Sequence, residues 1–168
     1  MKLVSGVKEQ NSYMRGLEYH SKLLDLIEHS EQELKKVIPG FIKSNNHKYR
    51  IIREPQLKDC SPGVTQVHNA HSPDFIIIHY FGKEIRMLFL EAKSREKGNP
   101  QTTYRERENL DTYLRVLKHY TEHCMEDLID SLVKYEVPRQ VIEKAKFEFR
   151  GMYRKGKHLE VYIPEFAR

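Results

Sequence analysis

Two apolar runs separated by a two-residue turn constrain the fold of this chain more than any other feature. The stretch that starts at Asp74 and ends at Lys93 is DFIIIHYFGKEIRMLFLEAK, and its β-branched, aromatic and aliphatic residues lie on either side of Gly82-Lys83. Glycine at the first position of a two-residue loop suits a type II′ hairpin turn. The pattern therefore predicts a β-hairpin.

The register of this hairpin brings charged residues together. If Phe81 pairs with Glu84, counting back one residue on each strand places Asp74 directly opposite Glu91. Opposed residues share one face of the sheet, with Cα atoms about 4.5 to 5.5 Å apart, and Lys93 shares the face of Glu91. Two carboxylates at that distance repel each other unless a proton or a cation lies between them, and hard oxygen ligands suit Mg²⁺ or Mn²⁺.

The rest of the chain predicts an α/β or α+β fold with a mixed sheet, because the elements follow the order helix, strands, helix, strands. Apolar spacing predicts the helices, and β-branched or aromatic runs predict the strands. The expected elements are a helix over about 13–37 ended by Pro39-Gly40, a strand over 48–54, the hairpin, one or two helices over 103–135, a short helix from Pro138, and strands in FEFRGMY and LEVYIP.

Length and composition predict a single domain over residues 1–168. The net charge of +5 permits a polyanionic partner without indicating one. No apolar run approaches the roughly 18 residues of a membrane helix, and the first residues lack the core of a signal peptide, so we expect an intracellular protein with no membrane partner. Cys60 and Cys124 lie far apart with no CxxC spacing, and we expect both to be reduced.

Pro73-Asp74, followed by Glu91-Ala92-Lys93 at the end of the next strand, resembles the motif of the PD-(D/E)XK nuclease superfamily. The superfamily includes restriction endonucleases, junction resolvases and viral cap-snatching endonucleases. The resemblance implies a restriction-endonuclease-like core, in which Asp74, Glu91 and the Ala92 carbonyl bind Mg²⁺ or Mn²⁺. It also implies that Lys93 orients or deprotonates the attacking water. A helix before the hairpin and another after it match the order of the superfamily.

Such nucleases usually add a residue from the first helix, commonly Glu, and two candidates are Glu18 and His20. At 100° per residue, His20 points near the centre of the apolar face of the helix and Glu18 nearly opposite. Cap-snatching enzymes are similar in using His at this place. We therefore expect His20 to be a catalytic and metal-binding residue, with Glu18 as the alternative.

The resemblance implies a divalent-metal-dependent endonuclease, and DNA is slightly favoured as the substrate because most of the superfamily cuts it. The alternatives are an RNA endonuclease of the cap-snatching type, acting in a host cell if viral, and a nucleic-acid-binding module without catalysis. We expect Arg95, Arg105 and Arg107 to bind phosphates, and the alternative is a solvated helix start. A homodimer is the simplest route to cutting both strands.

A different metal site is suggested by the segment 119–123, whose H-x-x-E-H pattern matches inverse zinc peptidases. His119 and His123 would face the same side of a helix. Two ligands do not complete a zinc site, and the third would have to come from the short remainder of the chain. We therefore expect these histidines to be exposed residues of a helix.

Overall fold

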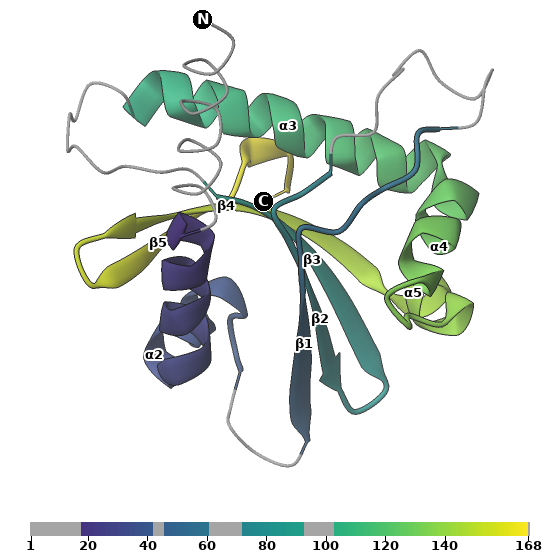
Figure 1. Cartoon of the computed structure of the whole chain (residues 1–168), viewed down its shortest axis with the longest axis horizontal. Helices are drawn as coiled ribbons and strands as arrows, with labels where there is room; N and C mark the ends of the chain where they lie inside the picture. Colours follow the sequence, from purple (N-terminus) through teal and green to yellow (C-terminus); the bar gives the residue numbers. More distant parts are fainter. Residues whose placement is uncertain (1–17, 42–45, 61–71, 93–102, 168) are drawn as a thin grey trace, which may run out of the picture.

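The structure, a computed structural model, describes residues 18–41, 46–60, 72–92 and 103–167 of the chain. A five-stranded sheet in the order β1-β2-β3-β4-β5 has helices packed on both faces (Figure 1). Residues 18–29 are helical, and a 3₁₀ turn, Glu165–Ala167, lies near the end of the chain. The other elements are α2 (Glu31–Val37), β1 (His47–Arg53), β2 (Phe75–Phe81), β3 (Glu84–Ala92), α3 (Thr103–His123), α4 (Met125–Val133), α5 (Arg139–Lys144), β4 (Lys146–Lys155) and β5 (His158–Tyr162).

The sheet is mixed. Strands β1, β2 and β3 form an antiparallel meander, β4 is parallel to β3, and β5 returns antiparallel to β4. The parallel pair requires a crossover connection, and α3, α4 and α5 provide it. The predicted α/β class with a mixed sheet flanked by helices is therefore confirmed.

The predicted register of the β2–β3 hairpin is also confirmed. Phe81 pairs with Glu84 at the turn, and Phe75 pairs with Leu90 at the other end of the ladder. Gly82, the first residue of the two-residue turn, has a φ of 58°, which only glycine adopts readily. Asp74 and Glu91 lie directly beyond the last pair of this ladder, Asp74 just before Phe75 and Glu91 just after Leu90.

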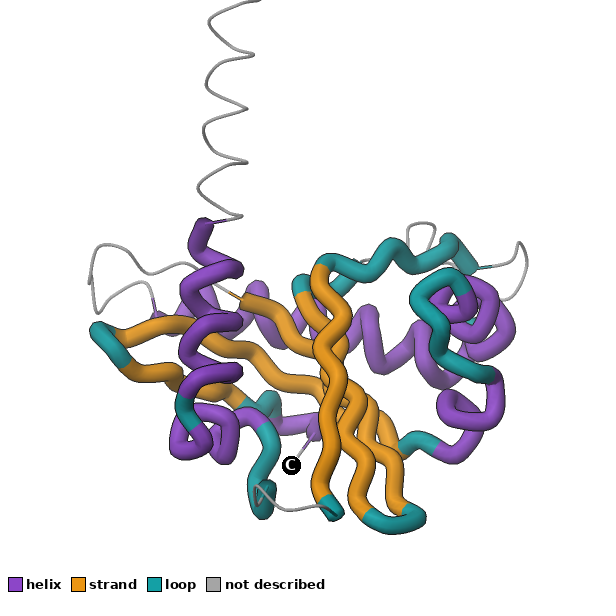
Figure 2. The backbone as a smooth tube through the Cα atoms, turned by 60° about the horizontal axis from the view of Figure 1, so that its bottom comes forward, coloured by secondary structure: helices purple, strands orange, loops and turns teal. Residues whose placement is uncertain are grey.

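The core lies on both faces of β2, which is the centre of the meander. Ile76 and Ile78 pack with α3, α4 and α5, whereas Phe75 and Ile77 pack with the helical residues 18–29 and α2. All four side chains are fully buried. Figure 2 shows the sheet between these two groups of helices. A strand covered on both faces is a continuous apolar run, which explains why FIIIHYF is the most apolar segment of the chain.

Helix α3 crosses the face of the sheet opposite α2. Its inward side chains include Leu110, Leu114 and Leu117, all buried. A Cβ atom on Gly151 of β4 would lie 2.9 Å from Leu110 Cδ1, so glycine at this position allows the helix to approach the strand closely. No helix among the described residues is both long and apolar enough to cross a membrane.

The helix boundaries refine the sequence prediction. Ser30 divides the single helix expected over 13–37, because its side chain accepts a hydrogen bond from the Glu33 N–H and caps α2. The start of that expected helix, residues 13–17, lies outside the described part of the chain. One or two helices were expected over 103–135, and the structure has two, α3 and α4, which meet at Cys124. Pro138 caps α5 as predicted.

The expectation that both cysteines are reduced is wrong. Cys60 and Cys124 form a disulfide, with their Cα atoms 5.5 Å apart. The segment that follows β1 lies against α3 and α4, where Tyr120 donates a hydrogen bond to the Lys58 carbonyl and the Lys58 N–H donates one to Ser131. This tertiary contact brings together two thiols that are 64 residues apart in sequence.

Candidate metal centre

The candidate centre lies where the β2–β3 hairpin ends. Asp74 precedes β2, and Glu91 and Ala92 are the last residues of β3. The Ala92 backbone N–H donates a hydrogen bond of 2.7 Å to Asp74 Oδ2, so the Asp74 carboxylate is held against the end of the neighbouring strand. Glu91, the residue before Ala92, is buried, with 4% of its surface exposed.

The helical residues 18–29 place His20 beside this hairpin end. His20 Nε2 lies 3.6 Å from Asp74 Oδ1, and only 13% of the His20 side chain is exposed. The imidazole meets the Phe75 ring edge-on, with 5.1 Å between the ring centroids. Glu18 is exposed. The structure thus directs His20, and not Glu18, toward Asp74.

Glu54 is a residue of this site that the sequence analysis missed. Its carboxylate Oε1 lies 3.0 Å from His20 Nδ1, and its backbone N–H donates a hydrogen bond of 2.8 Å to the Asp74 carbonyl. Glu54 follows β1 and has a φ of 47°, in the left-handed region. An acid as the last residue of the predicted strand was the only signal in the sequence, and it is a weak one.

The donor atoms suit a hard divalent cation. An Asp74 oxygen, a Glu91 carboxylate and the Ala92 carbonyl are the oxygen donors that Mg²⁺ and Mn²⁺ prefer, and His20 adds an imidazole nitrogen. Two ligands bound at about 2.1 Å and at right angles lie about 3.0 Å apart, so the 3.6 Å between His20 Nε2 and Asp74 Oδ1 requires a small closure.

To share an ion with His20 and Asp74, the Glu91 carboxylate requires a larger movement than the small closure between His20 Nε2 and Asp74 Oδ1. Among the described histidine, cysteine, aspartate and glutamate side chains, three ligand atoms lie within 4.8 Å of one another only at Cys60, Cys124 and Asp127. His20, Asp74 and Glu91 therefore do not form so close a group, and an ion shared by all three would draw their side chains together. The two sulfurs of the cysteine group are bonded to each other in the disulfide.

Several predicted residues lie beyond what the structure describes. Lys93 and Arg95 lie outside the described residues, as do the side chains of Arg105 and Arg107, whose backbone belongs to α3. Their roles in catalysis and phosphate binding remain predictions.

The alternative zinc site at the end of α3 acquires no third ligand from the described part of the chain. The rings of His119 and His123 do lie together, with centroids 4.3 Å apart. Neither histidine belongs to the group of three potential ligands found among the described residues. The H-x-x-E-H pattern here accompanies two helical side chains whose rings are in contact and tilted by 42°.

Comparison of the chain with protein-family models, with curated proteins and with solved structures finds no match.

Proposed function

We propose that this protein is a divalent-metal-dependent endonuclease with a PD-(D/E)XK site, which hydrolyses phosphodiester bonds in nucleic acid. The observation that carries the proposal is the hairpin register, which sets Asp74 against Glu91-Ala92 and leaves Asp74 Oδ1 facing His20. The meander β1–β3, the helical crossover to a parallel β4 and a helix on the opposite face are compatible with a restriction-endonuclease-like core.

Each residue of the site has a part in this proposal. Asp74, Glu91, the Ala92 carbonyl and His20 hold the ion, and the Ala92 N–H fixes the orientation of the Asp74 carboxylate. A bound Mg²⁺ or Mn²⁺ supplies polarisation of the scissile phosphate and a lower pKa for water. Lys93 orients the attacking water and offsets the charge that builds up on the phosphate.

DNA is the favoured substrate, and RNA is the alternative. The net charge of +5 is suited to a polyanion, and Arg95, Arg105 and Arg107 are the proposed phosphate contacts. The preference for DNA follows the majority of the nucleases that the motif resembles, whereas a histidine in place of the helix acid is a point of similarity with RNA-cleaving relatives. A homodimer would allow both strands of a duplex to be cut.

The test is incubation of the purified protein with supercoiled plasmid and with single-stranded RNA, each with Mg²⁺, Mn²⁺ or a chelator. We expect metal-dependent cleavage of the plasmid and no cleavage in the chelator. Cleavage of RNA alone would support the cap-snatching alternative. Binding of nucleic acid without cleavage under any metal would support a binding module and contradict the proposed activity.

A further inference from the structure

We infer that Glu54 is a positioning residue, which holds the His20 ring with its proton on Nδ1 so that Nε2 presents a lone pair toward Asp74. The consequence for metal binding rests on the proposed function. The assignment of the ring proton to Nδ1 is independent of the proposed function, because this assignment follows from contacts within the chain.

The hydrogen bond between the Glu54 and His20 side chains bears on which ring nitrogen carries the proton. Ionised carboxylates can only accept hydrogen bonds, and Nδ1 makes the shorter of the two contacts between the His20 ring and a carboxylate, 3.0 Å to Glu54 Oε1, so the geometry favours the ring proton on Nδ1. In a neutral imidazole the other nitrogen then has no proton. That nitrogen, Nε2, is the one 3.6 Å from Asp74 Oδ1, on the side of the candidate metal centre.

The backbone of Glu54 adopts a conformation that is uncommon for a residue other than glycine. Only Glu54 and Glu136, among the described residues other than glycine, have a positive φ. The left-handed conformation is unfavourable for a non-glycine residue, and it persists only where the surroundings hold it. Here the Glu54 N–H is bonded to the Asp74 carbonyl, so one residue is tied through its backbone to Asp74 and through its side chain to His20.

A carboxylate hydrogen-bonded to one nitrogen of a histidine suits metal binding through the other nitrogen. A histidine that binds a metal through one nitrogen commonly donates its other N–H to a carboxylate, which sets the tautomer and the direction of the ring. Glu54 occupies that place for His20. Because its carboxylate contacts Nδ1, it leaves Nε2 available for the ion.

The test uses nitrogen-15 spectra of the histidine rings, recorded on the metal-free protein at mildly alkaline pH. We expect His20 to carry its proton on Nδ1 in the wild type. Glu54→Ala removes the acceptor and should shift the proton to Nε2, whereas Glu54→Gln keeps an acceptor oxygen and should preserve the wild-type pattern. Glu136→Ala is the matched control, since it replaces the other glutamate with a positive φ and should leave His20 unchanged.

Circular dichroism establishes that each variant is folded. A wild-type His20 protonated on Nε2 or on both nitrogens would overturn the inference, as would a pattern that Glu54→Ala leaves unaltered.

Calorimetric titration with Mn²⁺ separates this inference from the proposed function. Loss of the outer partner of a metal-binding histidine commonly weakens affinity about 10- to 100-fold, and we expect that loss in Glu54→Ala with most of the affinity kept in Glu54→Gln. If the wild type binds no Mn²⁺ while the ring spectra behave as expected, the proposed function is wrong and the positioning of His20 by Glu54 stands. Equal Mn²⁺ affinity in the wild type and Glu54→Ala would contradict the role of Glu54 in metal binding.

Discussion

Asp74 combines two interactions that substitutions can separate. Its Oδ2 accepts the Ala92 N–H, which is a structural bond, whereas its Oδ1 faces His20 and is the oxygen available to an ion. Asparagine keeps an acceptor for the first interaction and removes the charge needed for the second. Alanine removes both.

We therefore predict that Asp74→Asn unfolds in urea nearly as the wild type does but loses metal-dependent cleavage. Asp74→Ala should lose cleavage and also about 1 kcal/mol of unfolding free energy, because the Ala92 N–H loses its partner. Urea unfolding and a plasmid cleavage assay measure the two effects. Full metal-dependent cleavage by Asp74→Asn would show that the site is elsewhere.

The sequence analysis named some residues of the candidate site and missed Glu54, for a physical reason. Asp74, Glu91 and His20 follow from regular geometry, namely the two-residue period of a strand and the 100° step of a helix. Glu54 does not, because its position depends on a left-handed residue and on how β1 lies against β2. Irregular backbone of this kind has no periodic signal in a sequence.

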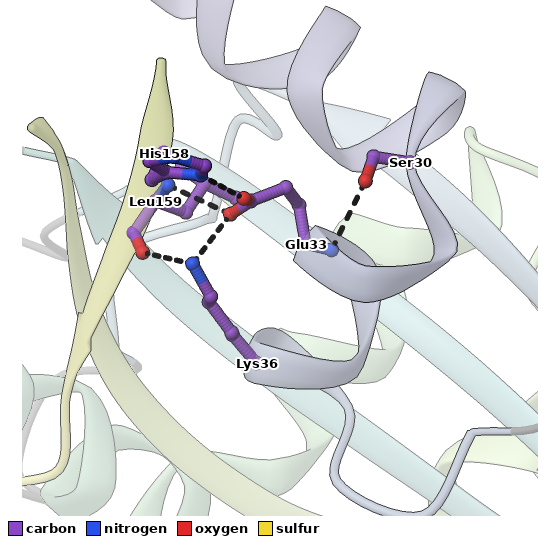
Figure 3. Close-up of polar contacts among 5 residues, drawn as sticks. All are labelled: Ser30, Glu33, Lys36, His158 and Leu159. Carbon is purple, nitrogen blue, oxygen red and sulfur yellow. Dashed lines mark hydrogen bonds and ion pairs between the residues drawn. The ribbon is translucent and has the colours of Figure 1, made fainter. Parts of the chain in front are cut away.

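At the level of elements, a buried carboxylate fastens α2 to β5 (Figure 3). Glu33 accepts hydrogen bonds from Lys36 Nζ at 2.9 Å and from the Leu159 N–H at 2.8 Å, and it contacts His158 Nδ1 at 2.8 Å. Burial would raise the pKa of Glu33, but the hydrogen bonds from Lys36, Leu159 and His158 outweigh it and lower the pKa to about 2. The short helix α2 therefore depends on a charged side chain as well as on apolar packing.

We predict that Glu33→Gln lowers the unfolding free energy by about 1 to 3 kcal/mol, because Gln keeps the shape but weakens charge-assisted bonds. Glu31→Gln, on the same helix with an exposed contact to Lys35, is the matched control and should change stability by less than about 0.5 kcal/mol. Urea unfolding measures both. Equal effects of the two substitutions would mean that the Glu33 contacts do not fasten the helix.

The disulfide between Cys60 and Cys124 joins the segment after β1 to the junction of α3 and α4. A cross-link over 64 residues restricts the unfolded chain, and native disulfides typically contribute about 2 to 4 kcal/mol. We predict a loss of that size on reduction, and a similar loss in the double variant Cys60→Ser, Cys124→Ser. Thermal unfolding with and without reductant measures it, and an unchanged melting temperature would contradict the prediction.

Elements with a regular pattern of apolar residues were predictable from the sequence, whereas the junctions between them were less predictable. The continuous apolar runs of β2 and β3 and the glycine turn were sufficient to predict their pairing. The break at Ser30 was not predicted, because the apolar spacing continues across it while the serine side chain caps a new helix. The disulfide depends on a contact distant in sequence, for which spacing carries no information.

Across the whole fold, two acids, the buried Glu33 and the half-buried Glu148, link stability to pH. Burial would raise the pKa of Glu148, but the guanidinium groups of Arg86 and Arg150 lower it to about 2, close to the value for Glu33. Both pKa values lie below the ordinary value of 4.5 in the unfolded chain. The stability that the ionised acids contribute is therefore complete above about pH 4.5 and is lost as pH falls toward 2.

We predict that the melting temperature falls steeply between about pH 4.5 and pH 2 and that Glu33→Gln makes this fall shallower, because one of the linked protons is removed. Scanning calorimetry across this range measures the slope. An equal pH dependence in the variant and the wild type would show that Glu33 does not take part in the acid transition.

Calorimetric titration of Mn²⁺ into the wild type, Asp74→Asn and Glu91→Gln measures whether the end of the β2–β3 hairpin binds a divalent cation. Each substitution removes a charged ligand and keeps the size of the side chain. We expect saturable binding by the wild type that is lost or greatly weakened in both variants. No binding by the wild type, or binding of equal strength in all three proteins, would contradict it.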